Sequence, residues 1–172
     1  MSTASVREAM QKLGEAIAEQ PEKARAKNVP ATARLLGDLK CEIRGPNGET
    51  AHTDMPPAVG GSASAPSPGW LMRASVASCT ATAIAMRAAK LGCQLTTLEV
   101  TVESTSDNRG LLGDDKISAG LGSITTRVKI GASGVAAEKL RELAKYGDDH
   151  SPMACTARIS PKYTLEVEVV GS

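Results

Sequence analysis

The alternation of apolar and polar residues predicts several strands. Leu39, Cys41 and Ile43 alternate with charged neighbours, which is typical of a strand with one solvent-exposed face. Pro46-Asn47-Gly48 supplies a turn, and a second short strand at 49–54 would complete a hairpin. The same alternation returns in three later segments, at residues 98–103, 124–130 and 163–169.

Apolar stripes at helical spacing predict two amphipathic helices. The first stripe consists of Val6, Met10, Leu13 and Ile17, at positions i, i+4, i+7 and i+11. Ser5 and Glu8 form a capping box at its start, and the helix should end near Pro21, before a charged linker that reaches Pro30. The second amphipathic helix is predicted over residues 135–146.

A longer helix lies between these segments. Ser67-Pro68 provides an N-cap followed by proline at N1, and Gly92 provides the residue after the C-cap. The stretch between them has only three charged residues: Arg73, Arg87 and Lys90. Because Ala, Ser and Thr occupy all of its faces, we expect this helix to be central and largely buried. A loop rich in Pro, Gly, Ser and Ala, residues 55–69, leads into it; it is either a passive connector or a functional segment.

The predicted order is strand, strand, long helix, strand, strand, helix, strand. This order indicates an α+β fold with an antiparallel sheet and a buried central helix. We expect residues 1–30 to form an N-terminal helical extension and linker, and residues 31–172 to form the main domain.

Composition adds a constraint on the core. The 172 residues are 41% hydrophobic and 23% charged, which suits a globular domain, but they include no Phe, one Trp and two Tyr. The core must therefore consist of Ala, Val, Leu, Ile and Met, which favours closely approaching backbones over aromatic packing.

Charge and cysteine usage exclude several function classes. The net charge is +1 and no Lys/Arg cluster interleaves with aromatic residues, which argues against nucleic-acid binding. No apolar run approaches a membrane span, and the first residues lack the order of a secretory signal, so we expect a cytoplasmic protein. Its four scattered cysteines should be reduced, and with two histidines they do not form a zinc pattern.

Two of the cysteines are candidates for chemistry. Cys79 lies eleven residues past Pro68, too far for the helix dipole to help ionise it, so local sequence alone favours packing. Cys155 follows Ser151-Pro152, a second N-cap-plus-proline signal, and would sit in the first turn of a short helix. The remaining two, Cys41 and Cys93, are expected to be structural.

The sequence "PSPGWLMRASVASCTATAIAMRAAKLG", the alternating strand after it, and "DDHSPMACTARIS" before a final strand resemble the OsmC/Ohr family. The resemblance covers about residues 31–170 and excludes the N-terminal helix. It implies an OsmC-like fold and an intertwined homodimer with active sites at the subunit interface. It also implies cysteine-dependent reduction of organic hydroperoxides and hydrogen peroxide, reset by a dithiol such as dihydrolipoamide, without metal, flavin or haem. By position, Cys79 matches the peroxidatic cysteine.

The chain departs from the family pattern at three places. The resolving cysteine of the family Cys-Pro-Val motif is Ser151 here, and the glutamate after the helix-opening proline is Gly69. The loop before the helix has no arginine and resembles a divergent branch with Asp54, Pro and Gly-Gly. We hypothesise that Cys155, one helical turn past Ser151, acts as the resolving thiol.

Other polar residues could support such a site. Arg73 or Arg87 could replace the missing arginine, while Asp54 and His150 are further candidates. Two other functions remain open at this point. One is a non-enzymatic OsmC-like dimer that binds a small apolar ligand at its interface, and the other is a structural or interaction protein, suggested only by the extra N-terminal helix.

Overall fold

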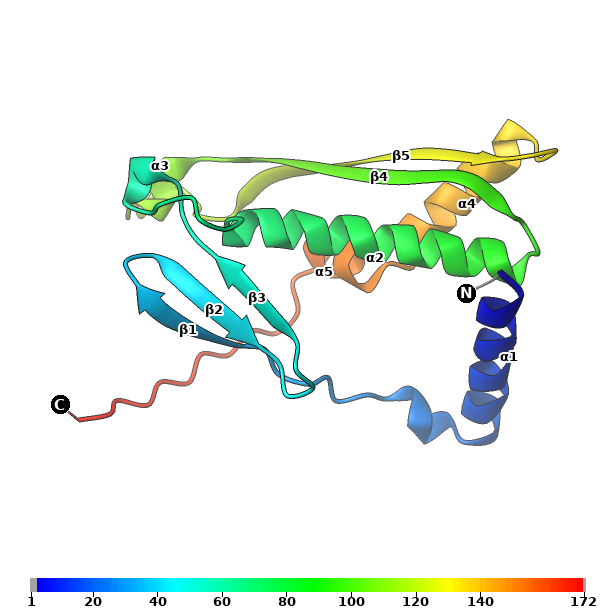
Figure 1. Ribbon diagram of the computed structural model, residues 1–172, viewed down its shortest axis with the longest axis horizontal. Helices are drawn as coiled ribbons and strands as arrows, with labels where there is room; N and C mark the ends of the chain where they lie inside the picture. The colour runs from blue at the N-terminus through cyan, green and yellow to red at the C-terminus, as the bar shows by residue number, and fades with distance from the viewer. Residues whose placement is uncertain (1–2, 172) are drawn as a thin grey trace.

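A long central helix, α2 (Pro68–Lys90), organises the computed structural model of the chain, which describes residues 3–171 (Figure 1). The predicted cap is present: the Ser67 Oγ accepts a hydrogen bond from the Trp70 amide at 3.2 Å. Gly92 has a φ of +68°, the left-handed conformation that glycine adopts after a helix end. Both predicted helix boundaries are thus confirmed.

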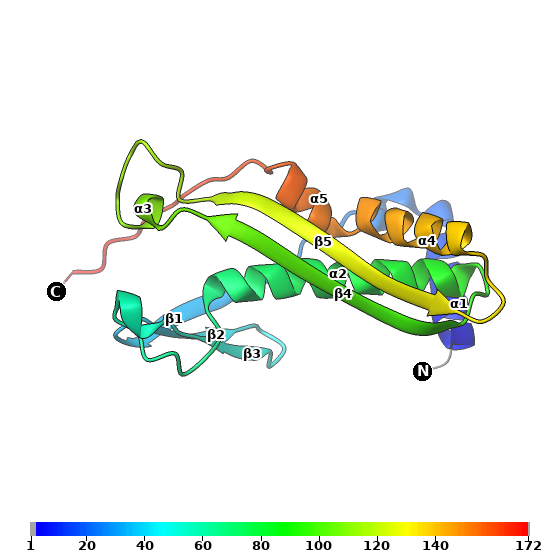
Figure 2. The ribbon, with the colours of Figure 1, turned by 90° about the horizontal axis from the view of Figure 1, so that it is seen from above.

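A two-stranded antiparallel sheet runs along α2 (Figures 1 and 2). It pairs β4 (Leu95–Ser106) with β5 (Leu121–Ala132), and the short helix α3 (Asn108–Leu111) lies in the connection. Half-buried residues alternate with exposed ones along both strands, as the sequence pattern predicts.

A separate three-stranded antiparallel sheet lies near the N-terminal end of α2 (Figure 1). The predicted hairpin is β2 (Lys40–Arg44) and β3 (Thr50–Thr53). Sequence reasoning missed the third strand, β1 (Thr32–Gly37), which pairs with β2. The adjacent residues Leu35 and Leu36 interrupt apolar alternation there, and every β1 residue is exposed, so a one-sided hydrophobic pattern does not occur.

Two helices pack against α2 from the C-terminal part of the chain. They are α4 (Ala137–Asp149) and α5 (Pro152–Arg158), both predicted from sequence. The closest approach is between Gly147 and Ile84: a Cβ on Gly147 would lie 2.7 Å from the Ile84 nitrogen and 2.9 Å from its Cα. Only glycine lets the backbones of α4 and α2 come this close.

We therefore expect Gly147→Ala to destabilise the protein by about 1–3 kcal/mol, because the new methyl group meets backbone atoms that cannot rotate away. Urea unfolding would measure this change. Gly14→Ala is the matched control: Gly14 is in a helix with nothing within 4 Å of its Cβ position, so the substitution should stabilise by about 0.5–1 kcal/mol. Equal behaviour of the two variants would contradict the close approach.

The N-terminal helix α1 (Thr3–Glu19) is the predicted amphipathic helix, although it begins two residues before the expected cap, Ser5. A short 3-10 helix, η1 (Pro21–Ala24), follows it. In Figure 1, α1 extends from the C-terminal end of α2, on the same side as the three-stranded sheet. No residue of α1 is buried.

Two expectations are not met within a single chain. The predicted final strand at 163–169 does not form; from Ile159 the described chain has no helix or strand and extends away from the body (Figure 1). The apolar side chains of this tail are almost fully exposed, with Val169 at 88%. The central helix is also less buried than predicted, because only Val76, Thr80, Ile84, Ala88 and Ala89 are inaccessible. None of the described helices is long and apolar enough to span a bilayer.

Candidate functional site

Cys79 lies at the middle of α2, on the border between its buried and exposed sides. It is half-buried and free, and it follows the buried residue Val76 by three positions. Ser78 and Thr82, its neighbours on the open side, are exposed. No hydrogen bond or ion pair joins Cys79 to another side chain within residues 3–171. Cys79 is therefore a partly accessible residue beside the open side of α2.

The short helix α5 holds the second candidate thiol. Ser151 is its N-cap, and the Ser151 Oγ, which is fully buried, accepts a hydrogen bond from the Ala154 amide at 3.3 Å. Cys155, one turn later, is half-buried, and its thiol donates to the Asp149 carbonyl at 3.2 Å. Ser151 thus serves the helix start, whereas Cys155 is free and partly accessible.

The helix register brings these two segments to the same part of α2. The pairs that lie together are Arg87 with Tyr146, Ile84 with Gly147, and Val76 with Ala154. These pairs show that α4 and α5 run antiparallel to α2. Interpolation between the pairs places Ser151 at about the level of Thr80, the residue after Cys79. Cys155 follows Ala154 on α5, and Cys79 precedes Thr80 on α2, so each cysteine is next in sequence to a residue buried in its helix.

A cavity of about 300 Å³ opens at this contact. Its lining residues are Val76, Ile124, Thr126, Asp148, Ala154, Ala157 and Arg158. The Arg158 Nη1 donates to the Asp148 carbonyl at 3.2 Å, and its Nη2 pairs with the Asp148 carboxylate. This pair attaches the end of α5 to the end of α4. Sequence reasoning missed it because the two residues lie ten positions apart across a helix break.

Two buried oxygens near the thiols have no hydrogen-bond partner among the described residues. They are the Thr80 Oγ1 and the Asp148 Oδ1. Thr80 is completely inaccessible, although Ser78 and Thr82, two positions to either side of it on α2, are exposed. The region around Cys79 is therefore not a fully satisfied apolar core.

The two arginines proposed as thiol activators are engaged elsewhere. The Arg73 Nη1 donates to the Ser104 Oγ at 3.3 Å and lies near Gly69. The Arg87 guanidinium stacks over the Tyr146 ring at 4.3 Å from the centroid. Along the helix axis they are about 9 Å and about 12 Å from Cys79, in opposite directions. The structure does not bring either of them to the thiol.

His150 is also bound elsewhere. It is exposed, its ring stacks on Tyr146 with centroids 3.9 Å apart, and its Nδ1 lies 2.8 Å from the Tyr146 carbonyl. It thus terminates α4 and makes no contact with the hydroxyl of Ser151. Within residues 3–171, no three His, Cys, Asp or Glu side chains gather as metal ligands.

Asp54 organises the loop between β3 and α2, which contains the 3-10 helix η2 (Pro57–Val59). Its carboxylate accepts hydrogen bonds from the Ser62 hydroxyl at 2.7 Å and from the Ser64 amide and hydroxyl at 2.9 and 2.8 Å. A Cβ on Gly61 would collide with the Met55 carbonyl. The loop is therefore held in one conformation, and Asp54 has a structural role in it.

These bonds make stability depend on pH. The Ser62 hydroxyl, followed by the amide and hydroxyl of Ser64, holds the pKa of Asp54 far below its ordinary value of 3.8. Since a lowered native pKa means that the unfolded state binds the proton first, the contribution of Asp54 is present above about pH 4 and lost as the pH falls below it.

We expect Asp54→Asn to lower the melting temperature at pH 7 by about 5 °C or more and to flatten its decline below pH 4. Thermal unfolding measured from pH 2 to 7 tests this. Asp38→Asn, at an exposed turn position, should retain the wild-type pH profile. A wild-type profile for Asp54→Asn would show that the carboxylate does not hold the loop.

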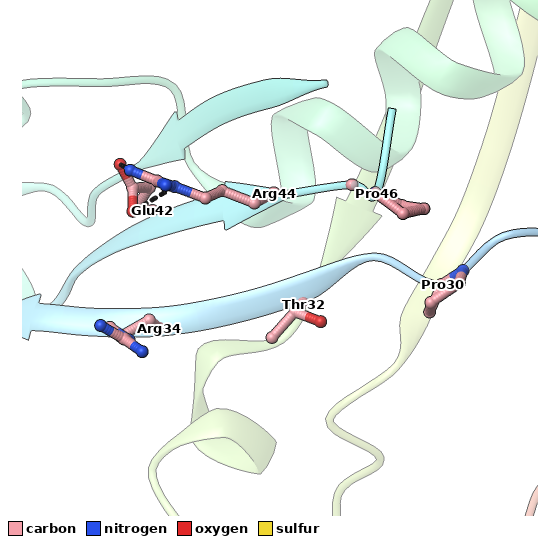
Figure 3. Close-up of a pocket in the computed structure, with 7 residues that line it drawn as sticks. Pro30, Thr32, Arg34, Glu42, Arg44 and Pro46 are labelled. Atoms are coloured by element: carbon pink, nitrogen blue, oxygen red, sulfur yellow. Dashed lines mark hydrogen bonds and ion pairs between the residues drawn. The ribbon is translucent and has the colours of Figure 1, made fainter. Parts of the chain in front are cut away.

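A second depression, of about 400 Å³, lies on the polar face of β1 and β2 (Figure 3). Within it, Arg44 binds Glu42 through two hydrogen bonds of 2.8 and 3.0 Å, and Arg34 lies on the neighbouring strand. It contains none of the cysteines or other candidate residues, and its charges are largely satisfied by this pair. It offers no chemistry comparable to that around Cys79.

Comparison with known proteins identifies one family and one fold. The family model described as OsmC-like protein matches residues 61–166. An OsmC-like protein from Mycoplasma pneumoniae superposes with a TM-score of 0.66 at 16% identity, covering 78% of this chain and 89% of its own. An organic hydroperoxide resistance protein OsmC from Legionella pneumophila superposes with a TM-score of 0.59 at 18% identity, covering 78% of this chain and 91% of its own. The organic hydroperoxide resistance protein OhrB of Bacillus subtilis superposes with a TM-score of 0.53 at 20% identity, covering 78% of this chain and 93% of its own. The search of curated proteins gave no significant match.

Proposed function

Because the chain belongs to the OsmC-like protein family, we propose that it reduces organic hydroperoxides through Cys79, at the expense of an external dithiol. The observation that carries the proposal is a free, partly accessible thiol at the middle of the central helix. Two of the similar structures are described as organic hydroperoxide resistance proteins, which is a property of those proteins that supports the choice of substrate class.

The proposed reaction has three balanced steps. The Cys79 thiolate attacks the terminal oxygen of ROOH; an S–O bond forms, the O–O bond breaks, and ROH leaves after taking a proton. Cys79 is then a sulfenic acid, oxidised by two electrons. Cys155 condenses with it, an S–S bond forms and water leaves. The dithiol reduces this disulfide by exchange, becomes a disulfide itself, and restores both thiols.

We assign the role of resolving thiol to Cys155, because Ser151, which occupies the position of the family's resolving cysteine, has no thiol. The Ser151 side chain is a hydroxyl and is committed to the α5 cap. Cys155 is on α5, which packs against the helix α2 that carries Cys79, and its hydrogen bond to the Asp149 carbonyl is the bond that it would release on reaction. Neither thiol belongs to another pair, so both are available for the disulfide, which α5 would close by moving along α2.

A homodimer completes the proposal. The single chain exposes 12,782 Å², whereas a compact monomer of 17.8 kDa exposes about 8,000 Å². The excess, about 4,800 Å² for one subunit, is at least as large as the area that one subunit of an obligate dimer buries. The exposed tail at 163–169 keeps the alternation of a strand, with Tyr163, Leu165 and Val167 on one side, so we propose that it pairs with a sheet of the second subunit.

We expect Cys79→Ser to lower the rate of hydroperoxide consumption by about 100-fold or more, because the nucleophile is removed. The assay would use tert-butyl hydroperoxide with dihydrolipoamide as reductant. Cys93→Ser is the matched control, since Cys93 is a half-buried cysteine at the end of the same helix and should leave the rate unchanged.

Equal, slow consumption by wild type and Cys79→Ser would contradict the enzyme. That result would favour the second candidate, a non-enzymatic dimer that binds a small apolar ligand. The observation behind this candidate is that the thiol has no charged partner: Arg73 and Arg87 are bound to Ser104 and Tyr146, and Gly69 replaces the family glutamate.

Peroxide treatment should also produce a disulfide between Cys79 and Cys155. One equivalent of hydroperoxide, followed by thiol blocking and peptide mass spectrometry, would locate it. In Cys155→Ser the Cys79 sulfenic acid should persist and react with a dimedone probe. Recovery of free Cys155 from oxidised wild-type protein, with Cys79 as sulfenic acid, would exclude Cys155 as the resolving thiol.

A further inference from the structure

We propose that α1, which lies outside the matched family region, is a docking surface for a second copy of this chain and helps to enclose the Cys79 site. The inference rests on the proposed function, because it assumes the homodimer. It goes further by assigning part of the interface to the N-terminal helix.

The apolar side of α1 is only partly covered by its own chain. Val6, Met10 and Ile17 are half-buried, while Leu13 on the same stripe is 59% exposed. A hollow of about 530 Å³ is lined by residues of α1 and by Lys90 at the end of α2. In proteins, most of the stability of a helix comes from packing its apolar face rather than from intrinsic helix propensity. The incomplete packing of α1 therefore indicates a missing partner.

The position of α1 shows where that partner would sit. The three-stranded sheet and α1 extend from opposite ends of α2 on the same side, and the linker between them has no regular structure after η1 (Figure 1). On α2 itself, Ser78, Thr82 and Ala85 are exposed. Cys79 lies beside this row. A body placed between the sheet and α1 would therefore contact the open side of α2 next to the thiol.

A second copy is the occupant that the observations favour. The exposed area exceeds that of a compact monomer by at least the area that one subunit of an obligate homodimer buries, and in a two-fold interface that includes α1 each copy of this helix would contact the partner. A membrane is disfavoured, because α1 has two cations, Arg7 and Lys12, against three carboxylates, whereas helices that lie on membranes are rich in Lys and Arg.

Leu13→Glu tests the proposal. Leu13 is exposed in the single chain, so a charge there should leave the subunit fold intact, as circular dichroism would verify, yet place a carboxylate in the dimer interface. Sedimentation equilibrium should show wild type as a dimer and Leu13→Glu with a dissociation constant at least about tenfold higher. Lys12→Gln makes the net charge one unit more negative, as Leu13→Glu does, but on the polar side of α1, and it should dimerise like wild type.

Leu13→Ala keeps a good helix former and removes only the apolar side chain, so it tests the contact if Leu13→Glu unfolds. We expect it to raise the dimer dissociation constant by a smaller factor than Leu13→Glu does. Wild-type dimerisation of Leu13→Ala and of folded Leu13→Glu would overturn the role of α1 while leaving the dimer and peroxidase standing. A wild-type chain that is monomeric, or that binds only another protein, would overturn the dimer itself. The peroxide assay with Cys79→Ser reports separately on the chemistry.

Discussion

The small side chains of α2 control how the rest of the subunit is arranged. Because Ala, Ser and Thr leave little bulk on the helix surface, α4 can approach until the backbone of Gly147 meets that of Ile84. Because its side chains are small, α2 can also bury only a limited apolar area. Among the described residues the inaccessible hydrophobic side chains are only Val76, Ile84, Ala88, Ala89, Leu143 and Ala154. Such a core is small for a domain of this size, which is why we propose that a second subunit covers part of the remaining apolar surface.

The proposed site follows from this packing. A cysteine on the border of a small-residue helix fits the available space and is also reachable, so tight packing and reactivity are compatible at Cys79. The α4–α5 segment runs back along α2 and places Cys155 on the helix that packs beside α2, about one helical turn past the level of Cys79. The chain thus contributes two thiols, whereas its candidate cations are held by Ser104 and by Tyr146.

Features coded by neighbouring residues could be predicted from the sequence. The Ser67-Pro68 cap, the hairpin of β2 and β3, and the apolar stripes of α1 and α4 each depend on a few adjacent positions. Features that depend on distant groups could not. Asp54 was a candidate for site chemistry, but its partners, Ser62 and Ser64, lie eight and ten residues away in a loop whose composition indicates flexibility. The tail after Ile159 has the pattern of a strand, but the single chain offers it no neighbour.

The Asp54 cluster has a consequence for association. Asp54 directly follows the strand β3, and Ser67 caps the start of α2, so the loop that the carboxylate holds is the joint between sheet and helix. An unrestrained loop of this length would lose conformational entropy when another molecule fixed the sheet against it. Here that ordering is already achieved when the subunit folds. The sheet and α2 therefore present a preorganised surface, and a molecule that docks between them need not order the joint.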